Sequence, residues 1–387
     1  MQLSRRVLSV SPSKTLAIAA KAKELKAQGV DVISLGAGEP DFDTPDFIKQ
    51  AAIQALQSGV TKYTPAEGTL ELRKSICAKF ERDQKLKFKP NQIIVSSGAK
   101  HSIFNSLFIL VNDGDEVLIP APYWLSYPEM VSMVGGKSVR IPTDEKTCFK
   151  VTPALLKKYI SKKTKMFILN SPSNPTGAVY DRGELEALIA VLKEYPDCVI
   201  LSDEIYEKLI YDGKKHVSIA QLDPGIAART ILVNGHSKAY SMTGWRLGYA
   251  AYPTGAMAEA AGSMQSHSTS NPVSFAQPGG VVALDKGDAD AARMCAAFEK
   301  RRNDFYSALC GIPKLEPFKP QGAFYMFVGI VKTGMDSLVF TEKLLAEGHV
   351  AVVPGQPFGA DHHIRMSFAA SEKNLEEAVR RIAAWLK

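Results

Sequence analysis

The feature that most constrains this fold is a unit repeated along the middle of the chain. A short, apolar, β-branched run is followed directly by polar or glycine-rich residues. Helical patterns lie between several of these runs, for instance over Glu184–Lys193. Such alternation predicts an α/β fold with a mainly parallel sheet. The candidate strands are Gln92–Val95, Glu116–Ile119, Met166–Leu169, Val199–Leu201, Thr230–Val233 and Leu247–Ala251.

The polar segments begin where these strands end, at Ser96, Pro120, Asn170, Ser202 and Asn234. In a parallel sheet, ligands bind outside the carboxyl ends of the strands. We therefore expect the five loops to converge on one cleft, as a cofactor site at the strand tips would require.

The distribution of charged residues along the chain indicates whether it could bind nucleic acid. The net charge is +7, but basic residues alternate with acids, as over Glu81–Lys85. The densest basic cluster, between Lys157 and Lys165, contains no arginine. This pattern predicts solvated helix and loop faces, and we expect no nucleic-acid partner.

Other features bear on compartment and metal binding. No apolar run reaches 18 residues, and no continuous apolar segment precedes Pro12, so neither a membrane span nor a signal peptide is expected. The five cysteines are odd in number and form no CxxC pair, which favours a reducing compartment. We expect a cytoplasmic protein. His362 and His363 are adjacent rather than spaced as ligands, so no metal site is expected.

The segment Ser237–Arg246 carries the strongest chemical signal. A lysine just past a strand end, among apolar neighbours, is a candidate for Schiff-base chemistry because partial burial disfavours the ammonium form. Most lysines are simply exposed, so Lys238 alone would be weak evidence. Arg246 changes that, because Ser237, Lys238 and Arg246 could together hold a phosphate at one strand end.

Three segments together resemble one known family. Ser237–Arg246 reads Ser-Lys-Ala-Tyr-Ser-Met-Thr-Gly-Trp-Arg, Asn174–Gly177 reads Asn-Pro-Thr-Gly, and Ser202–Tyr206 reads Ser-Asp-Glu-Ile-Tyr. In this order and spacing they resemble the class I aminotransferases of pyridoxal-phosphate (PLP) fold type I. The bacterial aspartate aminotransferase branch called Iβ is the nearest match, and the resemblance runs from Leu3 to the C-terminus.

The resemblance implies a two-domain architecture. A large domain would hold a mainly parallel seven-stranded sheet, and a smaller α+β domain would be built from both termini. Residues 1–45 would form the N-terminal segment of the small domain, 46–290 the large PLP-binding domain, and 291–387 the small C-terminal domain. From about Ala291 the sequence rhythm itself changes, with helical patterns over Ala291–Leu309 and Ser371–Leu386.

The resemblance also implies the cofactor, pyridoxal 5′-phosphate, and the residues that contact its ring. Lys238 would form the internal aldimine and later move the substrate α-proton. Asp203 would pair with the pyridine nitrogen and keep it protonated, which makes the ring an electron sink. Tyr206 and Asn174 would share the phenolate oxygen, and Trp124 would stack on the ring face.

The phosphate would lie against a helix N-terminus formed by Gly98, Ala99 and Lys100, with Ser237 and Arg246 completing the site. Tyr63 would reach the phosphate held by a partner subunit. That role implies a homodimer whose active sites lie at the interface.

For the substrate, Arg365 lies in an apolar, strand-like stretch where a buried arginine needs an anionic partner. The resemblance makes that partner the α-carboxylate, with Gly38, Trp124 and Asn174 also contacting the substrate. Lys100, helped by the hydroxyls of Ser13 and Thr15, would bind a side-chain carboxylate.

Taken singly, several of these residues have ordinary explanations. Asp203 could be a polar residue at a strand end or a helix cap, and Asn174 a turn residue before Pro175. Trp124 could be core packing, and the stretch around Gly38 a plain turn. Only the ordered set makes the functional interpretation stronger than these.

The predicted reaction is ping-pong transfer from L-aspartate to 2-oxoglutarate, giving oxaloacetate and L-glutamate. Activity on prephenate is expected to be weak, because Ser11 stands where prephenate-active relatives carry a basic residue. An aromatic or alanine aminotransferase, or a C–S lyase, would share Lys238, Asp203 and Arg365 and differ only in the side-chain pocket. A transcriptional regulator would need an added DNA-binding module. A nicotinamide dehydrogenase would need GxGxxG after the first strand, which the chain lacks.

Overall fold

The apolar runs form a seven-stranded sheet in the computed structural model, which describes residues 2–8, 10 and 14–387. The strand order is β2-β8-β7-β6-β5-β3-β4, and only β8 runs antiparallel to its neighbours. The predicted α/β fold with a mainly parallel sheet is confirmed. The strands are β2 (Ile93–Ser96), β3 (Glu116–Ala121), β4 (Lys137–Pro142), β5 (Thr164–Asn170), β6 (Val199–Asp203), β7 (Thr230–Gly235) and β8 (Gly248–Ala251).

Helices cover both faces of this sheet, because successive residues of each strand point to opposite sides. One face packs on α5, α6 and α10. The opposite face packs on α3, α4 and α11 near β2, β7 and β8, and on α7, α8 and α9 near β3, β5 and β6. These helices are α3 (Asp46–Gln57), α4 (Leu70–Gln84), α5 (Ala99–Leu110), α6 (Ser126–Met133), α7 (Pro153–Tyr159), α8 (Arg182–Leu192), α9 (Pro224–Ala227), α10 (Gly255–Ser268) and α11 (Ala276–Lys286).

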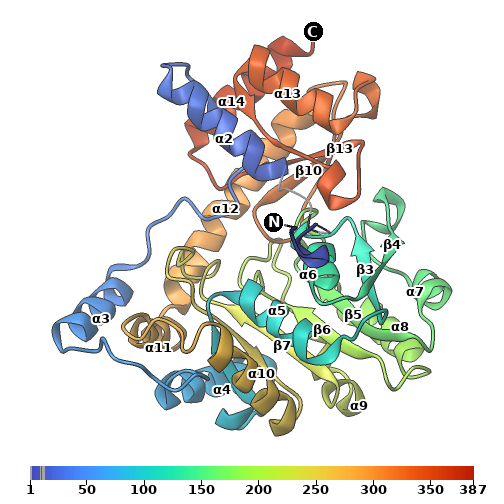
Figure 1. Ribbon diagram of the computed structural model, residues 1–387. Coiled ribbons are helices and arrows are strands. Elements are labelled where there is room, and N and C mark those ends of the chain that lie inside the picture. The colour runs from blue at the N-terminus through green and yellow to red at the C-terminus, as the bar shows by residue number, and fades with distance from the viewer. Residues whose placement is uncertain (1, 9, 11–13) are drawn as a thin grey trace.

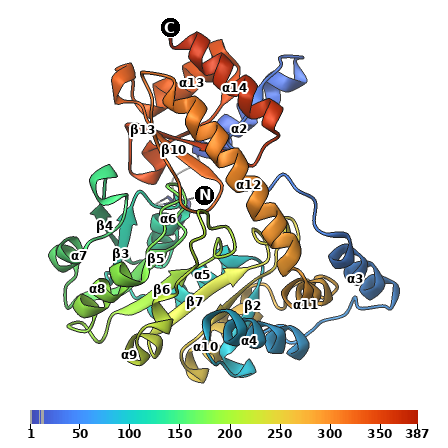
Figure 2. The ribbon, with the colours of Figure 1, turned by 180° about the vertical axis from the view of Figure 1, so that it is seen from behind.

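A second, smaller unit lies above the large sheet in Figures 1 and 2. Its antiparallel sheet has the order β12-β13-β10-β9, and the long helix α12 runs between the two units. The elements are α12 (Asp288–Cys310), β9 (Glu316–Phe318), β10 (Tyr325–Gly329), α13 (Ser337–Gly348), β11 (Val350–Ala351), β12 (Val353–Pro354), β13 (His363–Ser367) and α14 (Glu372–Trp385).

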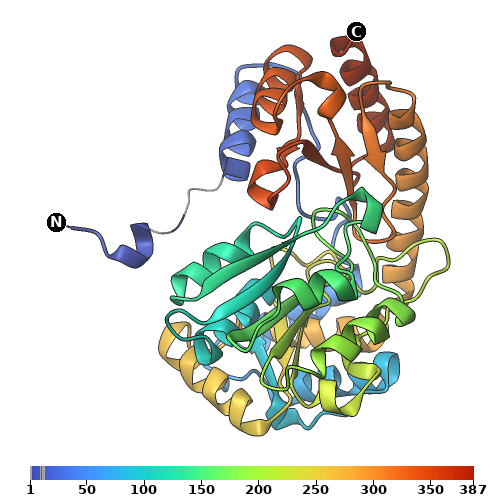
Figure 3. The same ribbon diagram turned by 90° about the vertical axis from the view of Figure 1, so that its right-hand side faces the viewer.

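The N-terminal part of the chain packs against this smaller unit. Strand β1 (Ile33–Ser34) pairs in parallel with β11, and α2 (Lys14–Ala27) contributes Ala22 to a core cluster with Leu345 and Ala351. Figure 3 shows the segment that carries α1 (Arg5–Leu8) standing out to the side of α2, and α1 contacts α6 of the large unit. The domain boundaries near residues 45 and 290 stay a prediction.

Local sequence signals explain where several helices begin. Helix α8 starts with a capping box, in which the Glu184 amide donates to Asp181 Oδ1 and the Asp181 amide donates to Glu184 Oε2, both at 2.9 Å. Thr69 caps α4 through its hydroxyl, which accepts from the Leu72 amide. These caps satisfy amide groups that a helix start leaves without partners.

Two features differ from the sequence analysis. Strand β4 was not predicted, because it is an edge strand in which Lys137 and Arg140 are exposed and Ser138 is only partly buried, and these polar residues hide the apolar pattern. The stretch Glu81–Lys85 is not a purely solvated face, because Gln84 is buried and Asp83 is partly buried. Their polar groups have partners inside the protein, and the alternation of charges in sequence does not reveal this.

Two general expectations can be compared with the structure. Within the described part of the chain, no helix combines the length and the apolar character needed to cross a membrane. All five cysteines are free thiols.

Candidate active site

The carboxyl ends of β2, β3, β5, β6 and β7 lie along one edge of the large sheet. Across this edge Ser96 pairs with Gly248, and Gly248 with Gly235. Nearer the other side, Asn170 pairs with Asp203. The loops that follow these strands therefore meet in one region, as expected from the sequence.

Lys238 lies three residues past the end of β7, in the turn that leads to Arg246. Its Nζ donates to the carbonyl oxygen of Gly38 and lies 5.9 Å from the ring centroid of Tyr206 and 5.8 Å from that of Phe324. Burial lowers the pKa of Lys238 to about 8, and repulsion from Arg365 acts in the same direction. A substantial fraction of the amine is therefore neutral near pH 8.

Asp203 is the last residue of β6 and is buried. The hydroxyl of Tyr127 donates to its Oδ2 at 2.6 Å, and the amide of Ile205 donates to its Oδ1 at 3.3 Å. Burial raises the pKa of Asp203 to about 6, although these hydrogen bonds oppose the rise. A carboxylate in such a place can bind a buried cationic N–H group.

Tyr206 and Asn174 are both buried, on the loops after β6 and β5, and Tyr206 lies close enough to feel the charge of Asp203. The hydroxyl of Tyr206 is 2.9 Å from that of Tyr325, and burial raises the pKa of Tyr206 well above its usual value. The side-chain oxygen of Asn174 accepts from Arg365 at 3.0 Å, and the backbone N–H of Asn174 donates to the side-chain oxygen of Asn170. Asn174 thus links the cofactor-side loops to the arginine predicted to bind substrate.

A cradle for an anion lies where β2 leads into α5. Gly98 has φ of +86° and precedes Ala99 and Lys100 in the first turn of the helix, where amide groups have no partners within the helix. A Cβ at Gly98 would lie 2.5 Å from Nη2 of Arg246, so only glycine lets the guanidinium lie this close. Ser237, also buried, lies on the turn after β7.

Arg246 itself has only carbonyl partners. It donates to the carbonyl oxygens of Thr243 at 2.8 Å and Ser97 at 3.4 Å. Among the described residues it has no carboxylate within ion-pair distance. An exposed guanidinium above a helix N-terminus suits a phosphate group, which it can contact with two parallel hydrogen bonds.

Arg365 lies in the middle of β13 and is 6% exposed. Its Nη1 and Nη2 donate to Asn174 and to the Gly36 carbonyl, while its Nε is buried without a partner. The guanidinium carbon stacks 4.3 Å from the ring centroid of Tyr325. Within the described chain no acid neutralises it, so the site lacks an anion that a substrate carboxylate would supply.

Lys100 and Trp124 lie next to each other at the edge of the site, where Lys100 Nζ is 4.9 Å from the ring centroid of Trp124. Trp124 also packs edge-on against Tyr127, with 5.3 Å between centroids. Partial burial lowers the pKa of Lys100, and the charge of Arg246 adds to this effect. Among the described residues, Lys100 is a further cation of the site with no carboxylate within ion-pair distance, and it lies close enough to Arg246 to feel its charge.

The structure gives few or no contacts with the site for the remaining predicted residues. Gly38 contacts Lys238 through its carbonyl oxygen. Tyr63 is 91% exposed and has no contact with this site in the single chain. Thr15 lies in α2, but its side chain is outside the described part of the structure, and Ser11 and Ser13 lie outside the described residues altogether.

Two residues of the site were missed in the sequence. Tyr127 holds Asp203 from α6, 76 positions away in the chain, and Tyr325 holds both Tyr206 and Arg365 from β10. Both tyrosines look like ordinary core aromatics in sequence. The one signal in the sequence was the position of Tyr127 three residues after Trp124, at the start of α6, where the Tyr127 amide donates to the Trp124 carbonyl oxygen.

The charged groups of the site together test whether the implied cofactor fits. Lys238 offers an amine, Asp203 a buried carboxylate, and Arg246 with the start of α5 a phosphate cradle. A compound with an aldehyde, a basic ring nitrogen and a phosphate would satisfy all three. The residues present therefore fit pyridoxal 5′-phosphate.

Comparisons with known proteins agree with this geometry. A family model described as aminotransferase class I and II matches residues 30–382. An aspartate aminotransferase of Bacillus subtilis is 49% identical over 100% of this chain and 99% of its own length. An aspartate/prephenate aminotransferase of Nitrosomonas europaea is 46% identical over 100% of both chains. The solved structure of Thermus thermophilus aspartate aminotransferase with maleate superposes with a TM-score of 0.95, at 42% identity over 100% of both chains.

Proposed function

This chain belongs to the class I and II aminotransferases, and on that premise we propose that it transfers the amino group of L-aspartate to 2-oxoglutarate. Its fold is that of the fold type I PLP enzymes, and its cofactor is pyridoxal 5′-phosphate. When bound, the cofactor supplies an aldehyde that accepts the amino group and a protonated ring that withdraws electrons from the substrate α-carbon.

The observation that carries the proposal is the buried, unpaired guanidinium of Arg365. Burying an arginine without an acid is costly, and a bound carboxylate removes that cost. The guanidinium reaches both Asn174 and the Gly36 carbonyl, which orient its remaining donors. We assign Arg365 to the α-carboxylate of the amino acid.

A dicarboxylate fits better than a monocarboxylate because of Lys100. Its ammonium lies over the Trp124 ring without an acidic partner among the described residues. A second carboxylate on the substrate would satisfy this charge. One solved relative is described with maleate, itself a dicarboxylate.

Lys238 is assigned to proton transfer as well as to holding the cofactor. Its lowered pKa gives a neutral amine that can take the proton from the substrate α-carbon. The Gly38 carbonyl accepts from its Nζ and keeps the amine directed toward the substrate side. Asp203, held by Tyr127, would keep the ring nitrogen protonated, and Tyr206 with Asn174 would donate to the ring oxygen.

The proposal is tested with the purified holoenzyme and a panel of amino acids. L-aspartate and L-glutamate should convert the cofactor absorbance, whereas L-alanine and L-phenylalanine should do so at least tenfold more slowly. Lys100→Met should reduce the preference for aspartate over alanine about tenfold or more, the effect of losing one charged contact of roughly 1.4 kcal/mol. Equal rates for all four amino acids would contradict the dicarboxylate assignment.

Prephenate is a second candidate acceptor, because one close relative is described as an aspartate/prephenate aminotransferase. We infer a weak activity here, since Ser11 replaces the basic residue expected in prephenate-active relatives. Rates on prephenate as high as those on oxaloacetate would overturn this inference.

We further propose that the enzyme works as a homodimer in the cytoplasm. The exposure of Tyr63 supports the dimer, because a tyrosine ring that is 91% exposed in one chain gains a partner in a second. Light scattering should give twice the 42.1 kDa of one chain. Mixing Lys238→Ala with Tyr63→Ala subunits should restore one complete site per hybrid dimer. No recovery on mixing would argue against shared sites.

A further inference from the structure

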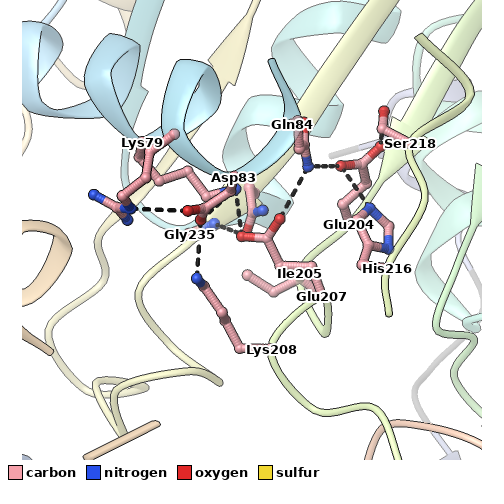
Figure 4. Close-up of polar contacts among 12 residues, drawn as sticks. Lys79, Asp83, Gln84, Glu204, Ile205, Glu207, Lys208, His216, Ser218 and Gly235 are labelled. Carbon is pink, nitrogen blue, oxygen red and sulfur yellow. Dashed lines mark hydrogen bonds and ion pairs between the residues drawn. The ribbon is translucent and has the colours of Figure 1, made fainter. Parts of the chain in front are cut away.

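Directly behind the candidate site lies a cluster of charged side chains, which we call the back cluster (Figure 4). It lies between the α4 side of the large sheet and the loop after β6, and most of its side chains are buried. Its members are Lys79, Asp83, Gln84, Glu204, Glu207, Lys208, His216 and Ser218.

Glu204 is the centre of this cluster and is 1% exposed. Ser202 and Ser218 donate to its Oε1 at 2.9 and 2.6 Å. Gln84 and His216 lie 2.7 and 2.9 Å from its Oε2. Each carboxylate oxygen thus has two partners, so the buried charge is fully solvated by the protein.

The strand alternation explains why Glu204 is not in the active site. Asp203 and Glu204 are adjacent, so their side chains point to opposite faces of β6. Asp203 points to the α6 face, where Tyr127 holds it, and Glu204 points to the α4 face. The amide of Glu204 also donates to the Val233 carbonyl oxygen, which continues the pairing with β7.

A cation site is the obvious alternative for these residues. Ligand atoms of Glu204, Glu207 and His216 lie within 4.8 Å of one another. However, the ammonium of Lys79 is 2.5 Å from Glu207 and only 1% exposed, so a fixed cation of the protein already neutralises this space. Gln84 also donates to both glutamates. The geometry therefore favours a self-contained ionic cluster.

Each acid of the back cluster has a basic partner. Glu207 pairs with Lys79, and Asp83 pairs with Lys208 and with Arg82 at the rim of the cluster. His216 is the basic group that contacts Glu204 directly.

We propose that Glu204 and His216 are positioning residues that set the proton affinity of Asp203 from the far side of β6. Glu204 holds a permanent negative charge one residue from Asp203, and His216 offsets part of it. The residues on either side of Asp203 are held on the same face, because Ser202 donates to the Glu204 carboxylate and the Glu204 amide donates to the Val233 carbonyl oxygen. The inference rests on the proposed role of Asp203 as the partner of the cofactor ring.

The pKa values of Glu204 and Asp203 are consistent with this arrangement. Burial acts to raise the pKa of Glu204, but the charge and hydrogen bond of His216 and the hydroxyl of Ser218 outweigh it, so the pKa falls to about 2. Burial is the main cause of the raised pKa of Asp203, and the charge of Glu204 adds to it.

All charged and titratable groups that face the two acids can be identified in the described structure. Tyr127 from α6, Tyr206 and Lys238 face Asp203. Lys79 from α4, with Glu207, His216 and, more distantly, Tyr249 from β8, surround Glu204. Glu204 adjoins Asp203 in the chain, and His216 acts on Asp203 through its direct contact with Glu204.

The test measures how the dissociation constant of pyridoxal phosphate from the apoprotein depends on pH between 5 and 8. The Asp203→Asn variant defines the part of that profile due to Asp203. The profile should have an inflection at the pH where Asp203 gains its proton. Glu204→Gln should move this inflection about one pH unit lower, because a negative charge is lost. His216→Gln should move it by a similar amount higher, because Glu204 is then less neutralised. Ser218→Ala keeps both charges and serves as the control, with no shift expected.

Opposite shifts are the specific outcome, because a purely structural defect would move both profiles in the same direction. Shifts of the same sign, or no shift in either variant, would overturn the inference. If Glu204→Gln does not fold, His216→Gln against Ser218→Ala still gives the sign. If Asp203→Asn binds the cofactor like the parent at every pH, the proposed role of Asp203 itself fails, which is a separate result.

Discussion

Similar numbers of charged groups lie on the two sides of β6, but the two sets differ in whether they have partners of opposite charge. On the active-site side, Lys100, Lys238, Arg246 and Arg365 have no carboxylate within ion-pair distance among the described residues. On the α4 side, every acid of the back cluster has a cation or amide partner within the protein.

The difference distinguishes charged groups that bind ligands from charged groups that stabilise the fold. Cations that the fold leaves unpaired are satisfied only by an added anion, so they identify a site for a phosphate and for carboxylates. Charges that the fold pairs are needed to keep the buried region satisfied. We therefore expect substitutions of the cations on the first side to remove function without loss of stability. Substitutions in the back cluster should instead lower stability, and those at Glu204 and His216 should in addition shift the pH dependence of cofactor binding.

On the active-site side, the largest loss of activity is expected for Lys238→Ala. The rate constant for transamination should fall by at least about 10⁴-fold, because both the cofactor attachment and the proton-transferring amine are lost. The free energy of unfolding of the apoprotein should not fall, since an unpaired amine is removed. Steady-state kinetics and urea unfolding measure the two quantities. A large loss of stability in this variant would break the comparison.

On the other side, Lys79→Met should destabilise the protein by about 3–5 kcal/mol, because Glu207 would be left buried without its cation. Urea unfolding of the apoprotein measures this change. Lys300→Met is the matched control, because Lys300 pairs with Asp304 and Glu372 on the surface and should leave stability unchanged. Equal effects of the two substitutions would mean that burial does not distinguish the back cluster.

Two arginines sharpen the comparison further. Arg302 is fully buried and pairs with Asp212 through two hydrogen bonds of 2.8 and 2.7 Å, whereas Arg365 is nearly as buried and unpaired. Arg365→Met should lower kcat/KM for aspartate by about 10²–10³-fold with no loss of stability. Arg302→Met should lower the free energy of unfolding by about 1–3 kcal/mol with little change in kcat/KM per folded molecule. Similar kinetic losses in both would refute the distinction.

Asp203 tests how the stability of the apoprotein depends on pH. Its folded pKa of about 6 lies above the ordinary 3.8, so the folded apoprotein binds the proton more tightly than the unfolded chain between these values. Stability should therefore fall as pH rises from about 4 to 6, by up to about 3 kcal/mol relative to Asp203→Asn. Unfolding curves at pH 4, 5, 6 and 7 measure the difference. A constant difference between variant and parent would contradict the raised pKa.

The sequence predicted those parts of this molecule that depend on local pattern. The strand runs, the loops after them and Lys238 all have signals within a few residues. Tyr127 and Tyr325 could not be predicted, because their roles depend on contacts between segments far apart in the chain. The same applies to Lys79 and Gln84, which look like residues of a solvated helix in sequence. In the structure both are buried, and their partners are Glu204 and Glu207 in the segment after β6.

Reduction of the holoenzyme with borohydride, followed by peptide mapping, tests the central assignment most directly. The account predicts that the cofactor becomes permanently attached to one peptide, the one that carries Lys238, and that Lys238→Ala abolishes this labelling. A cofactor label found on another lysine such as Lys100, or no label on a protein purified with excess cofactor, would contradict it.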